Sequence, residues 1–153
     1  MGSPIPAWGL FRLLKAVESR GTAGTLQIGI AGGTVTLALA AGRPYAASTR
    51  LAALSFSRFL KRTRGAARGD AATPKDLTEL GMPPEDVARL QQAHLKGVLS
   101  VVLPSPVSEW THDPEGEAPW AVRGPSVEVT AELMRAVAAF PDCLLYTSPS
   151  PRD

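Results

Sequence analysis

The side chains best suited to acid–base chemistry near neutral pH are two histidines, and neither lies in a catalytic context. His94 falls close to the apolar stripe of a predicted helix, which favours a core or boundary histidine over a base. His112 stands beside Asp113 in a proline-rich segment that is typical of a solvated turn. Their separation does not match a metal-ligand spacing such as HExxH. We therefore predict that neither histidine is a catalytic base or a metal ligand.

The other residues with chemical potential lack the neighbours that their chemistry needs. No serine lies in a Gly-x-Ser-x-Gly nucleophile elbow. Gly29, Gly32 and Gly33 suggest a phosphate loop, but no Gly-Lys-Ser/Thr follows and the segment predicts a strand instead of a helix. The carboxylates between Asp113 and Glu117 could hold a hard cation, although such loops are usually solvated. The expectation is a protein without catalytic residues, metal or cofactor.

The C-terminal segment differs in composition from the rest of the chain. The last eleven residues, Cys143–Asp153, match the translation of a transposase-type sequencing adapter, and we expect this Ser/Pro-rich tail to be disordered. A natural Pro/Ser tail is the alternative. On the adapter interpretation, residues 1–142 are a single native domain from a longer protein and lack cysteine. In either case a single cysteine excludes an internal disulfide and a multi-cysteine zinc site.

Charge is distributed unevenly along the chain. Residues 1–69 carry ten Lys/Arg and one Asp/Glu, a formal charge of +9. Residues 70–153 carry six Lys/Arg and thirteen Asp/Glu, a formal charge of −7, so the net charge of +2 is a cancellation. This polarity is a better indication of partners than the net charge.

A predicted second helix concentrates the positive charge and forms a candidate interaction surface for an acidic protein or nucleic acid. Its cations are Arg58, Lys61, Arg62 and Arg64. Alternatively, the basic half of the chain faces the acidic half within one fold. Phe56 and Phe59 lie among these cations, but their spacing fits helix packing better than base stacking.

Apolar periodicity predicts a helix followed by a small sheet. Leucines at helical spacing indicate a helix over Trp8–Arg20, with Gly21 at its C-terminal cap. Alternating β-branched and apolar residues then indicate a meander of three antiparallel strands. The strands are expected at Gly24–Ala31, at Thr34–Ala40 and around Tyr45-Ala46.

Four glycines are expected to shape the turns of this sheet, namely Gly24, Gly32, Gly33 and Gly42. We predict a type I′ turn at Gly32-Gly33, because this turn needs positive φ at both positions. Gly24 ends the link from helix to strand, and Gly42 permits a tight turn after Ala41.

The rest of the chain predicts further helices and one more hairpin. The helices are expected at Leu51–Thr63, Thr73–Gly81, Met82–Leu103 and Thr130–Phe140, with a flexible loop at Gly65–Ala72. Thr73, followed by Pro74 and Asp76, is the expected N-cap of the helix that it begins. The expected apolar residues of the last helix are Leu133, Met134, Val137 and Phe140. The hairpin, over Ser108–Arg123, places Trp110 and Trp120 on either side of a turn at Asp113–Gly116. Because strands and helices are segregated, we predict an α+β fold with a small antiparallel sheet covered by about five helices.

This order of elements resembles the PATAN-type domain of bacterial signalling proteins. The matching motifs are Thr22–Leu26 ("tGtL"), Gly42–Ala46 ("dGr…A", with Ala41 in place of the acidic residue) and Leu80–Val87 ("lG…eel"). The resemblance covers about Ala7 to Phe140, and its motifs are short and structural. It implies a non-catalytic interaction module found beside receiver, chaperone-like or small-GTPase-regulatory domains, and it carries over no catalytic residue.

We therefore expect a cytoplasmic protein–protein interaction module of bacterial signalling, with Arg58, Lys61, Arg62 and Arg64 as its candidate surface. No apolar run approaches the roughly 20 residues that a membrane helix needs, so we expect no membrane partner. Two alternatives remain. One is a nucleic-acid-binding module that uses the basic helix, and the other is a small-ligand sensor with its pocket between sheet and helices.

Overall fold

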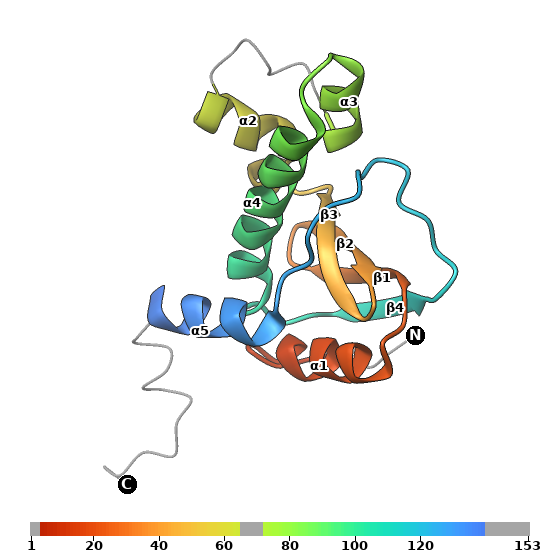
Figure 1. Ribbon diagram of the computed structural model, residues 1–153. Helices are drawn as coiled ribbons and strands as arrows, with labels where there is room; N and C mark the ends of the chain where they lie inside the picture. The colour runs from red at the N-terminus through yellow and green to blue at the C-terminus, as the bar shows by residue number, and fades with distance from the viewer. Residues whose placement is uncertain (1–3, 65–71, 140–153) are drawn as a thin grey trace, which may run out of the picture.

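The computed structural model describes residues 4–64 and 72–139, which form a small sheet and the helices around it (Figure 1). In chain order the elements are α1 (Leu10–Arg20), β1 (Gly24–Ile30), β2 (Gly33–Ala40), β3 (Arg43–Thr49), the 3-10 helix η1 (Ala52–Leu54), α2 (Phe56–Arg64), α3 (Pro74–Glu79), α4 (Pro84–Val102), β4 (Glu109–Asp113) and α5 (Val129–Ala139). The predicted loop up to position 71, Phe140 and the tail Cys143–Asp153 lie outside the described residues.

The four strands form one antiparallel sheet in the order β3-β2-β1-β4. The alternation that predicted strands also sets their register, because side chains two residues apart share a face. Leu26 lies opposite Leu37 and Ile28 lies opposite Val35, and all four side chains are fully buried. The predicted α+β class and the three-stranded meander are confirmed.

The predicted type I′ turn is on the wrong hairpin. Ile30 pairs with Gly33, so the β1–β2 loop is Ala31-Gly32, and only Gly32 has positive φ (95°). Gly33 already belongs to β2. Both central residues have positive φ in the β2–β3 turn instead, at Ala41 (53°) and Gly42 (82°). Glycine is needed at position 42 because a Cβ there would lie 2.7 Å from the backbone of Glu18.

The predicted second hairpin is also wrong, although its turn forms. The Gly116 amide donates to the Asp113 carbonyl at 3.0 Å, but the chain does not return as a strand. β4 instead pairs with β1, where Trp110 lies opposite Ile28. Trp120 lies in the following loop, and its carbonyl accepts from the Lys75 amide. The prolines of this loop lack the N–H groups that a returning strand would have to donate.

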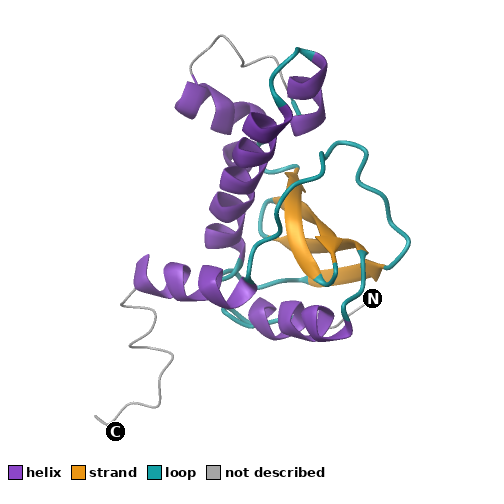
Figure 2. Cartoon of the chain, viewed as in Figure 1, coloured by secondary structure: helices purple, strands orange, loops and turns teal. Residues whose placement is uncertain are grey.

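The main hydrophobic core lies where one face of the sheet meets α1 and the C-terminal half of α4 (Figure 2). The buried residues that α1 and α4 contribute to this core are Leu10, Leu14, Val17, Leu95, Val98, Leu99 and Val102. Their spacing of three or four residues places them on one side of each helix. The predicted apolar stripes of these two helices are confirmed.

A second, smaller hydrophobic cluster holds α2 and α3 against the N-terminal half of α4 (Figure 1). Its buried members are Phe56, Leu60, Leu77, Met82, Val87 and Leu90. α3 begins with the predicted cap: the Thr73 hydroxyl accepts from the Asp76 amide, and the Asp76 carboxylate accepts from the Thr73 amide. The 19-residue α4 therefore carries both clusters and connects the sheet to the helical end of the molecule.

Two predicted helices differ in detail from those observed. The helix expected at Leu51–Thr63 is divided into η1 and α2, because Ser55 between them has extended backbone angles. On α5, Leu133 packs against the core as expected, but Met134 is 64% exposed and Glu132 is buried in its place. Within the described residues, no helix has the length and apolarity that crossing a membrane requires.

Candidate functional site

The basic face of α2 is defined here as Arg58, Lys61 and Arg62. Helical geometry separates these side chains from Phe56 and Leu60, which point the opposite way into the smaller cluster. The Ser55 hydroxyl accepts from the Arg58 amide at 3.2 Å and satisfies a donor of the first turn. All three cations of the basic face are exposed. α2 ends at Arg64, whose side chain lies outside the described part of the structure.

The ion pairs within the described residues do not involve the basic face of α2. Glu18 accepts from Lys15 at 2.6 Å and from Arg43 at 2.9 Å, and these two hydrogen bonds, the one from Lys15 above all, lower the pKa of the Glu18 carboxyl. The other two pairs, Arg89–Asp86 and Arg135–Glu132, each lie within one helix. In the described ranges no ion pair joins the basic half of the chain to the acidic half.

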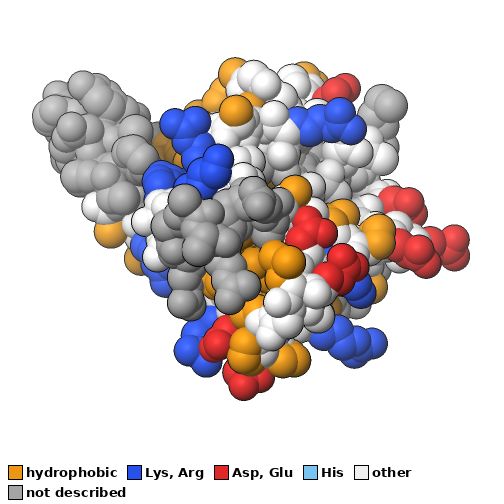
Figure 3. Space-filling view, turned by 90° about the horizontal axis from the view of Figure 1, so that it is seen from above, with side chains coloured by type: hydrophobic (Ala, Val, Ile, Leu, Met, Phe, Trp, Pro, Cys, Tyr) orange, Lys and Arg blue, Asp and Glu red, His pale blue; other side chains and the backbone are white. Residues whose placement is uncertain are grey.

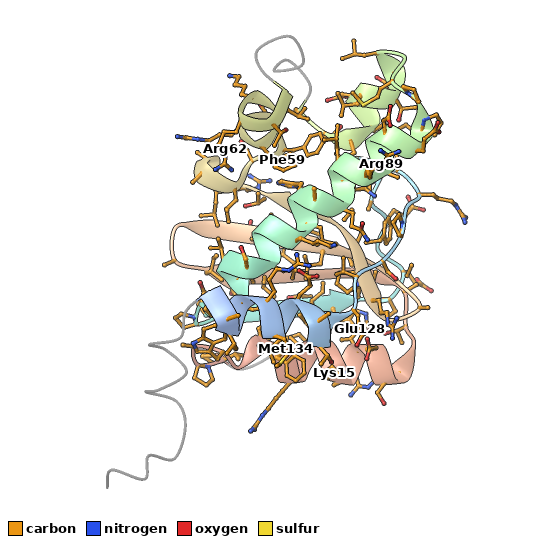
Figure 4. All side chains as sticks on the ribbon, turned by 60° about the vertical axis from the view of Figure 1, so that its left-hand side comes forward. Lys15, Phe59, Arg62, Arg89, Glu128 and Met134 are labelled. Atoms are coloured by element: carbon orange, nitrogen blue, oxygen red, sulfur yellow. The ribbon has the colours of Figure 1, made fainter. Side chains whose placement is uncertain are left out.

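A groove of about 260 Å³ runs beside the basic face, between η1–α2 and α4. Phe59 and Leu54 line one side, Gly97 and Val101 line the other, and Arg62 lies at the rim. Figure 4 shows Phe59 on the side of α2 toward α4 and Arg62 on the outer side. Figure 3, viewed from the α2–α3 end, shows Lys and Arg side chains gathered beside apolar ones. The surface therefore combines positive charge with an apolar hollow.

His94 forms the base of this groove and is a structural residue. Its side chain is 4% exposed, and its Nε2 lies 2.7 Å from the Leu54 carbonyl oxygen. A carbonyl only accepts, so the neutral ring carries its proton on Nε2. The ring packs edge-on against Phe56, with centroids 5.2 Å apart, and lies 5.5 Å from Phe59. The prediction of a core or boundary histidine is confirmed.

Burial of His94 makes the stability of the fold depend on pH. Burial lowers the pKa of His94 below its usual 6.5, with the hydrogen bond to Leu54 opposing this shift. The unfolded chain therefore takes up a proton near pH 6.5 that the folded chain does not, and stability decreases as pH falls below this value. We expect a slope of up to about 1.4 kcal/mol per pH unit in urea unfolding between pH 7.5 and 5.5. His94→Gln, which keeps a donor for Leu54, removes this contribution, and equal slopes in both proteins would contradict it.

The other residues considered for chemistry are separated and bonded to backbone. The prediction that His112 is a solvated turn residue is wrong, because His112 is a half-buried residue of β4 opposite Leu26, with its Nε2 3.3 Å from the Ala23 carbonyl oxygen. The Asp113 carboxylate accepts from the Glu115 amide within its own turn. Among the described residues no group of three or more His, Cys, Asp or Glu side chains is placed to hold a metal. His94 and His112 lie on different elements, so the structure does not assemble them into a site.

Sequence patterns alone did not identify the groove. Gly97 and Val101 lie four residues apart on α4, and nothing in their types distinguishes them from ordinary helix residues. The residue that could have indicated the groove is Val101. It is apolar but 40% exposed, because it lies outside the stripe of residues that α4 buries. Comparison with family models, curated proteins and solved structures finds no match to this chain.

Proposed function

We propose that this domain is a non-catalytic protein–protein interaction module that binds an acidic partner through the basic face of α2 and the adjoining groove. The observation that carries the proposal is the basic face itself: its three cations are exposed and take part in none of the ion pairs of the described residues. Exposed cations gathered on one face attract and orient a surface of opposite charge.

The groove supports a protein partner more than a nucleic acid. Nucleic-acid sites of this kind offer aromatic faces on which bases stack. Of the two aromatic side chains of α2, Phe56 is 5% exposed, and Phe59 stacks on it at a centroid distance of 6.0 Å while lining the groove, so this surface offers no row of open aromatic faces. An acidic segment that carries one apolar side chain satisfies both the cations and the groove. Sequence resemblance to PATAN-type domains suggests a receiver, chaperone-like or GTPase-regulatory domain in the bacterial cytoplasm as this partner.

The test compares capture by the wild-type domain with capture by the triple variant Arg58→Glu/Lys61→Glu/Arg62→Glu. We expect nuclease-treated bacterial lysate to yield acidic proteins that the triple variant retains at least about tenfold less, because like charges then face each other. Circular dichroism checks folding, since each substitution is exposed and costs only about 0.5 kcal/mol or less. Quantitative mass spectrometry measures retention.

A matched control reverses three exposed cations elsewhere: Arg20→Glu/Lys75→Glu/Arg123→Glu. This variant has the same net charge as the test variant, and we expect it to capture the same proteins as wild type. Equal losses in both variants would show nonspecific electrostatics and contradict the proposal. Duplex DNA binding that weakens steeply with salt and is lost only in the test variant would establish the nucleic-acid alternative instead.

A further inference from the structure

A second pocket lies between the N-terminal segment, α1 and β4, the strand at the other edge of the sheet from β3. It is an open pocket of about 520 Å³, lined by Pro4, Ile5, Pro6, Ala7, Trp8, Gly9, Arg12, Leu13 and Trp110. This volume is within the range of roughly 300–1,000 Å³ that small-molecule pockets occupy. The basic face of α2 contributes none of these residues, so the pocket is separate from the site proposed above.

Backbone hydrogen bonds fix the wall of this pocket. Ile5 and Val107 exchange two hydrogen bonds of 2.8 Å, which tie the N-terminal segment to the residues before β4. The chain then turns, with the Gly9 amide donating to the Pro6 carbonyl at 2.9 Å. A Cβ on Gly9 would lie 2.9 Å from the same carbonyl oxygen, so the turn is closely packed. The pocket therefore has a formed wall and does not depend on a ligand to create it.

Trp8 has a backbone conformation that side chains of its size seldom adopt. Its φ is 67°, in the left-handed region that favours glycine. Such strain persists where the surroundings hold it, and it is concentrated at binding sites. Trp8 lines the pocket together with Trp110 of β4. Both side chains are half-buried.

The charge of the lining selects the ligand class. Arg12 is exposed and is the only charged side chain among the lining residues. A guanidinium pairs with a carboxylate through two parallel hydrogen bonds, and flat indole faces favour a planar apolar group. We propose that this pocket binds a small planar aromatic carboxylate, with Arg12 holding the carboxylate and the two indoles enclosing the ring.

The experiment uses the three tryptophans as reporters, because the chain contains only three. Trp8 and Trp110 line the pocket, whereas Trp120 lies in the loop that contacts α3. The probes are indole-3-acetate, the uncharged indole-3-acetamide and acetate, titrated into ¹⁵N-labelled protein. Indole N–H cross-peaks are assigned by single Trp→Phe variants. We expect indole-3-acetate to shift the Trp8 and Trp110 signals and leave the Trp120 signal in place.

The charge requirement is tested by Arg12→Gln, with Arg20→Gln on the same helix as the matched control. Loss of a charge-assisted hydrogen bond is expected to weaken indole-3-acetate binding about 10- to 100-fold. The amide and acetate should bind wild type at least about tenfold more weakly than the acid. Unchanged signals at millimolar acid, movement of all three signals together, equal affinity of acid and amide, or equal effects of the two Arg variants would each overturn the proposal.

Discussion

Gly24→Ala is expected to lower the free energy of unfolding by about 4 kcal/mol, the largest effect of any substitution considered for this domain. Two costs add. Gly24 has a φ of 98°, which side chains with a Cβ rarely adopt. A Cβ there would also lie 2.6 Å from the Pro114 carbonyl carbon and overlap the Asp113 carbonyl oxygen. The pairing of Thr25 with Asp113 fixes the positions of these atoms. The overlap with the new Cβ can therefore be relieved only if the end of β4 separates from β1.

Gly81→Ala is the matched control for this effect. Gly81 has a similar φ of 92°, but nothing lies within 4 Å of a Cβ at this position. It therefore isolates the backbone strain, which we expect to cost about 1 to 2 kcal/mol. Urea unfolding of the two variants measures the difference. Equal losses would show that the close approach of β4 to Gly24 contributes nothing.

Gln91→Leu is expected to cost about 3 kcal/mol, because it leaves three partly buried backbone groups without their hydrogen-bond partners. The Gln91 side chain is 1% exposed, and it connects α4 to two other segments. Its Nε2 donates to the carbonyls of Tyr45 and Val122 at 3.2 and 2.8 Å, and its Oε1 accepts from the Val122 amide at 2.9 Å. Leucine keeps the volume but removes the hydrogen bonds to the Val122 amide and to the Tyr45 and Val122 carbonyls, all of them in partly buried residues.

The neighbouring Gln92→Leu serves as the control, since Gln92 is half-buried and on a different face of α4. We expect it to change the free energy of unfolding by about 0.5 kcal/mol or less. Hydrogen exchange adds a second readout: Gln91→Leu should increase exchange at the Val122 amide specifically. A Gln91→Leu protein as stable as wild type, with that amide still protected, would refute this role.

Sequence patterns correctly predicted the parts of the fold that depend on residues close together in sequence. Alternation in β1 and β2 buried Leu26, Ile28 and Leu37 as expected, and Thr73 with Asp76 capped α3. The prediction was wrong where the pairing of a strand depends on a partner distant in sequence. The segment with Trp110 reads as half of a local hairpin, yet it pairs with β1 about 80 residues earlier. Its alternation is the same in either arrangement, so the pattern could not select the partner.

The turns and the buried side of α5 also differ from the prediction, again because segments distant in sequence determine them. Two consecutive glycines suit a type I′ turn, but the register of β1 with β2 places the loop one residue earlier. The turn with positive φ at both central positions lies at Ala41-Gly42 instead, where α1 passes so close that only a glycine fits at position 42. In α5, the periodicity of Leu133 and Met134 gave no sign that Glu132 would be the buried neighbour.

The candidate surface was partly predictable. The concentration of cations on α2 follows from composition, and their exposure follows from the apolar stripe of Phe56 and Leu60. The groove could not be predicted, because it depends on how α2 crosses α4. The pocket beside Trp8 likewise depends on a pairing of Ile5 with Val107 that no local pattern encodes.

The most direct test of the central claim asks where a captured partner touches this domain. A photo-reactive benzoylphenylalanine replaces Arg62 in one protein and the exposed Glu115, in the turn after β4, in another. The proposed function predicts that the partner cross-links from position 62, through peptides rich in Asp and Glu. It also predicts that Arg58→Glu/Lys61→Glu abolishes this cross-link. Cross-linking of the same partner from position 115 but not from position 62 would contradict it.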